Sequence, residues 1–77
     1  MVARVEAAAG NLLKLQRLTE RERGVVRLIC EGLTTRAIAE QLTVSEFTVA
    51  THRRNILHKL ELHNVAALTQ FAREQGL

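Results

Sequence analysis

The side chains best suited to polar recognition are concentrated in residues 48–60 of the sequence. This stretch contains Arg53, Arg54 and Lys59, two histidines and no acidic residue. An arginine can donate two hydrogen bonds to O6 and N7 of a guanine, and both arginine and lysine pair with phosphate oxygens. The pattern therefore favours recognition of nucleic acid.

Two helices of unequal length, joined by a tight turn, are expected to position these side chains. Ile38, Ala39 and Leu42 predict the apolar side of a first helix over residues 35–42, and a second helix is expected over residues 46–61. The inner stripe of the second helix consists of Val49, His52, Ile56 and Leu60, and its outer face of Glu46, Phe47, Ala50, Thr51, Arg54 and His58. This order is typical of a helix-turn-helix, whose second helix lies in the major groove of DNA.

Two further helices are expected on either side of this unit. Thr19 and Glu22 form a capping-box pattern, which predicts a helix that begins after Thr19 and ends at Gly32. Another helix is expected over residues 65–75, because Asn64 can cap its start and a glycine follows its end. The predicted fold is therefore all-α, with four helices.

Length and composition limit the class of protein. Seventy-seven residues make one small domain, which we place at residues 18–77 after a partly helical linker segment at residues 1–17. The single cysteine, Cys30, excludes an internal disulfide and agrees with a reducing cytoplasm. No apolar run approaches the roughly 18 residues that a membrane span needs, and the N-terminal residues lack the pattern of a signal peptide. We therefore expect a soluble, cytoplasmic protein.

The residue pattern does not support catalysis or metal binding. His52, His58 and His63 are six and five residues apart, so no pair shares a helix face in the register of a metal site. Cys30 lies among apolar residues, where we expect a small buried hydrophobe and not a redox sensor. No nucleophile has a paired base and an orienting acid. We expect no enzyme activity, no metal and no cofactor.

Five short sequence motifs lie between residue 18 and the C-terminus, and matching them to one family needs no insertion or deletion. They are Leu18-Thr19-x-Arg21-Glu22, Gly32-Leu33-Thr34, Ile38-Ala39-x-x-Leu42-x-Val44-Ser45, Thr48-Val49-x-x-His52-x-x-Asn55-Ile56-x-x-Lys59-Leu60 and Gly76-Leu77. Together they resemble the LuxR-type (GerE-like) helix-turn-helix DNA-binding domain of bacterial transcription regulators. The resemblance implies double-stranded DNA as the partner and regulation of transcription as the function.

Contacts to bases are expected from the N-terminal half of the second helix, where side chains can reach base edges. The expected residues are Ala50, Thr51 and Arg54, at positions that match the base-contacting residues of the family. Ala50 departs from the family, which usually has a lysine there. Contacts to the DNA backbone are expected from the hydroxyl and basic side chains of both helices. These residues are Thr34, Thr35, Arg36, Ser45, Thr48, Arg53, His58 and Lys59.

The last helix is apolar over a wider arc than one packing face needs. Leu68, Phe71 and Ala72 are expected to pack under the helix-turn-helix, and Val65 and Thr69 remain beside them. The resemblance implies a homodimer through this helix, bound to inverted half-sites, and RNA polymerase is a further candidate partner. The expected interface consists of Val65, Leu68, Thr69 and Ala72.

Two alternatives stay open. Members of the family usually carry a signal-receiving domain ahead of this one, and residues 1–17 are too few to hold it. The chain is therefore either a fragment of a longer regulator, such as a response regulator, or a free-standing small regulator. The rival function is a helix-turn-helix scaffold that docks on a protein partner through its last helix. Ala50 and the modest net charge of +3 keep that rival open.

Overall fold

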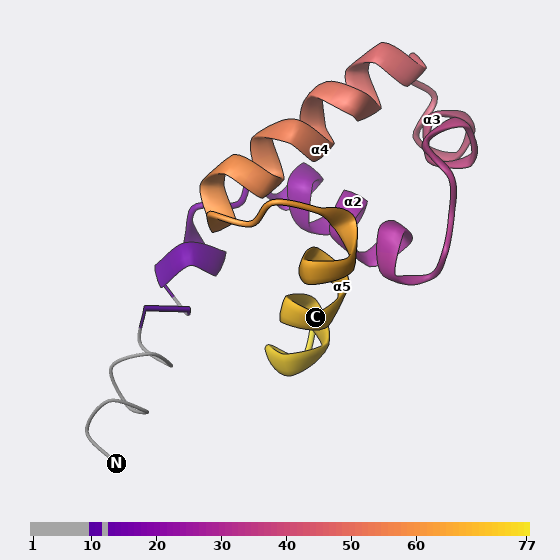
Figure 1. The fold of residues 1–77 in the computed structure, drawn as a ribbon. Coiled ribbons are helices and arrows are strands. Elements are labelled where there is room, and N and C mark those ends of the chain that lie inside the picture. The colour runs from indigo at the N-terminus through magenta and orange to yellow at the C-terminus, as the bar shows by residue number, and fades with distance from the viewer. Residues whose placement is uncertain (1–9, 12) are drawn as a thin grey trace.

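A computed structural model describes residues 10–11 and 13–77, and within them the chain is all-α (Figure 1). The principal helices are α2 (Glu20–Cys30), α3 (Thr35–Leu42), α4 (Glu46–Leu60) and α5 (Val65–Glu74). The predicted all-α fold is confirmed, and α4 and α5 each end one residue earlier than predicted. Most of the predicted linker, at residues 1–9 and 12, lies outside the described residues.

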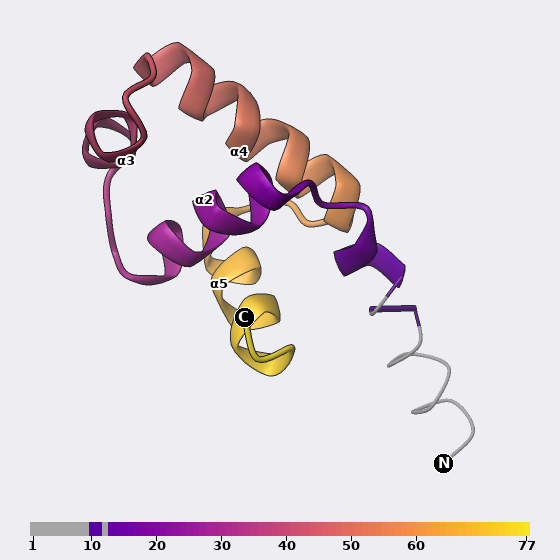
Figure 2. The same ribbon diagram turned by 180° about the vertical axis from the view of Figure 1, so that it is seen from behind.

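Helix α2 lies at the centre of the arrangement and contacts α3, α4 and α5. In the first view α3 is seen almost along its axis while α4 runs across the picture, so the two helices cross steeply (Figure 1). The view from behind shows α2 between α4 and α5 (Figure 2). This arrangement leaves one whole side of α4 without a covering helix.

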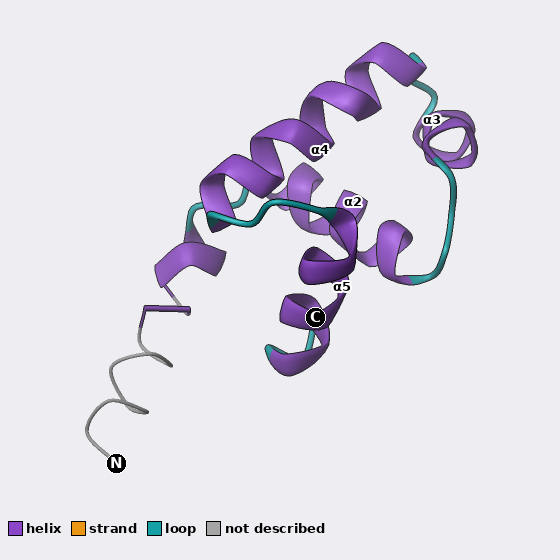
Figure 3. Cartoon of the chain, in the orientation of Figure 1, coloured by secondary structure: helices purple, strands orange, loops and turns teal. Residues whose placement is uncertain are grey.

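Each of the four helices begins at a side chain that accepts a hydrogen bond from a backbone amide three residues later. The pairs are Thr19 with Glu22, Thr34 with Ala37, Ser45 with Thr48 and Asn64 with Ala67. A helix start leaves backbone N–H groups without partners, and an oxygen at this position satisfies one of them. Each cap fixes where its helix starts, and only three or four residues separate consecutive helices (Figure 3).

The helix ends share a second device, a left-handed residue followed by an apolar one. Gly32 takes this role after α2, with φ of 91°, as the sequence predicted. Thr43 and Glu61 take it after α3 and α4, although neither is a glycine. The apolar residues that follow the four helices are Leu33, Val44, Leu62 and Leu77, and all pack against the core. Each also donates its backbone N–H to a carbonyl five residues earlier, which closes the helix end.

The core is built from small aliphatic side chains contributed by all four helices. Its fully buried members are Val25, Val26, Ile38, Val49, Ile56, Leu60, Leu68 and Ala72. The N-terminal helical residues are held by Arg23, whose guanidinium donates a hydrogen bond to the carbonyl oxygen of Leu15 at 3.2 Å. No helix in the described part of the chain is long and apolar enough to cross a bilayer.

Candidate nucleic-acid interface

Helix α4 is divided lengthwise into a buried side and an exposed side. Val49 and Ile56 are fully buried on the side that packs against α2 and α3, and His52 is half-buried next to them. On the opposite side Phe47, Thr51, Arg54 and His58 follow one another at spacings of four, three and four residues, which places them in one line. Phe47, Arg54 and His58 are exposed and Thr51 is half-exposed.

The predicted base-contacting residues lie on this exposed side. Ala50 and Arg54 are both exposed, and Thr51 lies between them along the helix. Ala50 presents only a methyl group beside Thr51. The structure thus presents a guanidinium together with two small side chains on one accessible helix face.

The turn before α4 brings two of the predicted backbone-contacting residues together. Ser45 caps α4 by accepting a hydrogen bond from the backbone N–H of Thr48 at 3.0 Å. The two hydroxyl oxygens also lie 2.9 Å apart, in hydrogen-bonding contact. Both hydroxyls are therefore held in place at the start of the helix, on the surface of the molecule.

A second pair joins α3 to α4 across the helix-turn-helix. The Arg53 guanidinium donates a hydrogen bond from Nη1 to the Thr35 hydroxyl at 2.6 Å. Both residues were expected to contact the DNA backbone, but no sequence pattern indicated that they touch each other. The contact uses one of the five N–H donors of the guanidinium, and it fixes the orientation of the others near the N-terminus of α3.

The remaining predicted residues of α3 are found at its exposed start. Thr34 caps the helix by accepting a hydrogen bond from the backbone N–H of Ala37 at 3.1 Å. Arg36 forms an exposed ion pair with Glu40, one turn further on, at 3.4 Å. A surface pair of this kind contributes little stability, so the guanidinium can exchange this partner for another anion.

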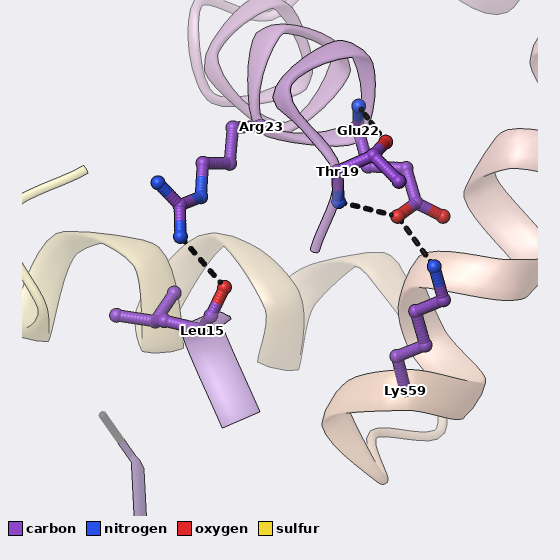
Figure 4. A network of polar contacts seen from close by, with 5 residues as sticks. All are labelled: Leu15, Thr19, Glu22, Arg23 and Lys59. Atoms are coloured by element: carbon purple, nitrogen blue, oxygen red, sulfur yellow. Dashed lines mark hydrogen bonds and ion pairs between the residues drawn. The ribbon is translucent and has the colours of Figure 1, made fainter. Parts of the chain in front are cut away.

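Lys59, at the far end of α4, is paired with an acidic residue, which the sequence did not predict. Its ammonium donates a hydrogen bond to Oε1 of Glu22 at 2.6 Å (Figure 4). The same carboxylate oxygen accepts the backbone N–H of Thr19 at 2.8 Å, as part of the capping box of α2. Burial alone would raise the pKa of the Glu22 carboxyl, but the hydrogen bonds from Lys59 and Thr19 outweigh it and hold this pKa below 4.5.

Basic residues also gather where α4 ends, and sequence reasoning missed two of them. A surface hollow of about 570 Å³ is lined by Arg17, His58, Lys59 and His63, and also by Leu57, Glu61 and Leu62. Arg17 belongs to the segment before α2 and His63 to the loop after α4. These residues are 46 positions apart in the chain, so only the fold could reveal that they line the same hollow.

Part of the expected dimer interface is wrong. Leu68 and Ala72 are both fully buried in the core of the chain itself, so they have no surface to offer a partner. The pattern correctly assigned both to the packing face of α5, and the same two residues cannot serve both roles. Val65 and Thr69 are half-buried at the edge of that face, and the Thr69 hydroxyl donates a hydrogen bond to the carbonyl oxygen of Val65 at 3.0 Å.

The cysteine and histidines form no reactive group in the part of the chain that the structure describes. Among those residues, no group of three or more His, Cys, Asp or Glu side chains is arranged to hold a metal ion. Cys30 is a free thiol, half-buried against the core, and burial raises its pKa despite the nearby charge of Arg73. A raised thiol pKa disfavours the reactive thiolate.

Known proteins are similar to this chain in sequence and in fold. The family model of bacterial regulatory proteins, luxR family (GerE), matches residues 16–72. A nitrate/nitrite response regulator protein homolog of Haemophilus influenzae is 49% identical over 62 residues, which make up 80% of this chain and 30% of that protein. The nitrate/nitrite response regulator protein NarP of Escherichia coli is 43% identical over 60 residues, which make up 77% of this chain and 28% of that protein.

A solved structure agrees with the fold over almost the whole chain. The low-resolution structure of the response regulator StyR matches with a TM-score of 0.90 at 32% sequence identity. The match covers 94% of this chain and 36% of StyR. The chain spans between 27% and 41% of the length of these curated relatives.

Proposed function

The chain belongs to the LuxR family of bacterial regulatory proteins and forms the helix-turn-helix DNA-binding domain of that family, and on this premise we propose that α4 reads base sequence in the major groove. This kind of domain binds DNA and is not an enzyme. The observation that carries the proposal is the exposed line on α4, in which Thr51 and Arg54 point away from the core beside Ala50. Arg54 is assigned the bidentate contact to a guanine, and Ala50 and Thr51 the apolar or hydroxyl contacts to neighbouring bases.

Phosphate contacts surround this line on both helices and set the position of α4 in the groove. Their proposed donors are Thr34, Thr35, Arg36, Ser45, Thr48, Arg53, His58 and Lys59. The hydrogen bond between Arg53 and Thr35 supports this, because it holds a guanidinium at the N-terminus of α3, where free backbone N–H groups also favour an anion. Lys59 retains two donors beyond its bond to Glu22, which it can direct to a phosphate.

The domain acts as a homodimer in this proposal, and Val65 and Thr69 of α5 lie at the two-fold axis. A symmetric dimer places two α4 helices in successive major grooves, so the operator has inverted half-sites with centres about 10 bp apart. The bound domain regulates transcription in the bacterial cytoplasm as the output domain of a response regulator or related LuxR-type regulator, with RNA polymerase as a further partner. The names of the three similar proteins reported above, each a response regulator, support this role.

A binding selection tests the proposal and separates it from the rival protein-docking function. The chain is incubated with a library of random duplexes, and the retained sequences are amplified and titrated at low and high salt. We expect one enriched inverted motif and an affinity that falls linearly on a log–log plot against salt concentration. Absence of retention at low salt would reject DNA binding by this chain and favour a protein partner.

A further inference from the structure

One large apolar side chain on the exposed side of α4 has no role in the assignments above. Phe47 is 80% exposed, and only Leu13 joins it as an exposed large hydrophobic residue in the described part of the chain. The only other phenylalanine, Phe71, is buried in the core. A single exposed apolar residue is common on a protein surface, so the position of Phe47 on the helix must decide whether it has a function.

That position is the first turn of α4, on the line that leads to the proposed base-reading residues. Phe47 stands three residues before Ala50 and four before Thr51, so the ring and the two small side chains are neighbours on the helix surface. Seven residues separate it from Arg54, which is two turns further along the same side. The aromatic ring therefore extends the proposed reading face toward the N-terminus of the helix.

At this end of α4 the hydroxyls of Ser45 and Thr48 are the proposed phosphate contacts, whereas Phe47 suits a base edge better than the DNA backbone. The charged residue there is Glu46, whose carboxylate would repel a phosphate, and the phenyl ring of Phe47 offers a phosphate no hydrogen bond. In the major groove, thymine alone among the four bases presents a methyl group, and phenylalanine is one of the side chains that can contact it. The exposed ring thus matches one base-specific apolar group.

We propose that Phe47 is a specificity-determining residue that packs on the 5-methyl group of a thymine in each half-site, next to the bases read by Thr51 and Arg54. This inference rests on the proposed function, because it requires α4 to lie in the major groove. It assigns to the chain a preference for thymine that hydrogen bonding alone would not give, since the contact is made with a methyl group.

Removing the methyl group from the DNA tests the inference directly. Each thymine of the selected operator is replaced in turn by deoxyuridine, which differs only in lacking the methyl group, and the duplexes are titrated with the wild-type chain and with Phe47→Ala. We expect the wild-type chain to lose about fourfold in affinity at one thymine per half-site, the value of about 0.8 kcal/mol for one buried methyl group. Phe47→Ala should bind the thymine duplex more weakly and should no longer distinguish the two bases there.

Matched variants separate this result from general effects. Leu13→Ala removes the other exposed apolar side chain, which lies outside α4, and should leave binding to both duplexes unchanged. Phe47→Leu keeps an apolar side chain and should retain part of the preference. Circular dichroism should show an unchanged fold for all three, because both side chains are exposed.

Three outcomes would overturn the inference. The first is equal affinity of Phe47→Ala and the wild-type chain for the thymine operator. The second is an equal loss with Phe47→Ala on the thymine and deoxyuridine duplexes, which would place the ring on the sugar-phosphate backbone or on a protein. The third is a wild-type chain that ignores every deoxyuridine substitution. Failure of the proposed function looks different, because the wild-type chain would then select no operator at all.

Discussion

The ammonium of Lys59 lies 2.6 Å from Oε1 of Glu22, so the last turn of α4 is tied to the N-terminal cap of α2. The Glu22 side chain is 5% exposed, while that of Lys59 is 33% exposed. A nearly buried carboxylate is therefore neutralised from the solvent side by a single lysine. Because α4 carries the proposed reading face, this pair also fixes the end of that helix relative to the domain core.

Lys59→Met should reduce the free energy of unfolding at neutral pH by about 1–3 kcal/mol, because it leaves the Glu22 carboxylate without its charged partner. The pH dependence should change too. The pKa of Glu22 in the folded protein lies below its ordinary value of 4.5, so its contribution is complete above pH 4.5 and is lost as pH falls through the folded pKa. In Lys59→Met the stability that is lost as the pH falls should be smaller. Urea unfolding across the acid range measures both effects.

The control for this variant is Lys14→Met. Lys14 forms an ion pair with Glu61 at 3.1 Å and lowers the pKa of that carboxyl as well, but Glu61 is exposed. Surface pairs contribute little, so Lys14→Met should be nearly neutral. Stability curves of wild type and Lys59→Met that run parallel through the acid range would show that the pair does not contribute to the pH dependence.

The two glycines near α2 should respond to alanine with opposite signs. An added Cβ would meet no atom within 4 Å at either Gly24 or Gly32, so packing does not distinguish them. Gly24 lies inside the helix, and Gly24→Ala should stabilise the chain by about 0.5–1 kcal/mol. Gly32 has φ of 91°, and Gly32→Ala should destabilise it by about 1–2 kcal/mol. Thermal or urea unfolding measures the change in stability of both variants. Changes of the same sign would contradict this interpretation of Gly32 at the helix end.

The sequence was most informative where the interactions are local. Each N-cap acts on an amide three residues away, so Thr19, Thr34, Ser45 and Asn64 could be recognised from spacing alone. The exposed side of α4 could also be predicted, because it follows from the helical periodicity of residues that are close in sequence. Left-handed residues could be predicted only where glycine marks them, and therefore Gly32 was found while Thr43 and Glu61 were not.

Contacts between distant residues could not be predicted in the same way. Lys59 and Glu22 are 37 positions apart, and Arg53 and Thr35 are 18 apart, so their pairing depends on how the helices pack. The wide apolar arc of α5 is a second case in which the sequence alone was not sufficient. Periodicity shows that Leu68 and Ala72 share a face, but only the packed structure shows that this face is fully used by the core.

Arg53 and Thr35 should affect DNA binding in two distinguishable ways. Arg53→Ala removes a charge, so it should weaken binding on every sequence and lower the slope of log K against log salt by about 0.9 per subunit. Thr35→Val keeps the charge and the side-chain shape but removes the hydroxyl that accepts from Arg53. It should weaken binding uniformly with the slope unchanged. Titrations at several salt concentrations measure both, and a changed base preference in either variant would contradict a backbone role.

The proposed dimer should fail to form when charge is placed at the edge of α5. Val65→Glu would bring two like charges near the two-fold axis, so affinity for the full operator should fall sharply while affinity for an isolated half-site changes little. Val65 is half-buried against the core, so Val65→Gln serves as a neutral control of equal length. Titration with full and half-site duplexes separates the effects. Equal losses with Glu and Gln, or on both duplexes, would mean that Val65 supports the fold and not the dimer.

The claim that α4 reads the major groove is tested most directly by changing single guanines of the selected operator. 7-Deazaguanine removes the N7 acceptor from the major groove, whereas inosine removes only the amino group in the minor groove. We expect 7-deazaguanine at one position per half-site to cost the wild-type chain about 1–3 kcal/mol, and inosine there to cost much less. Arg54→Ala should lose a similar amount on the normal operator and be indifferent to 7-deazaguanine at that position. Loss with inosine but not with 7-deazaguanine, or equal sensitivity of Arg54→Ala and wild type, would contradict the account.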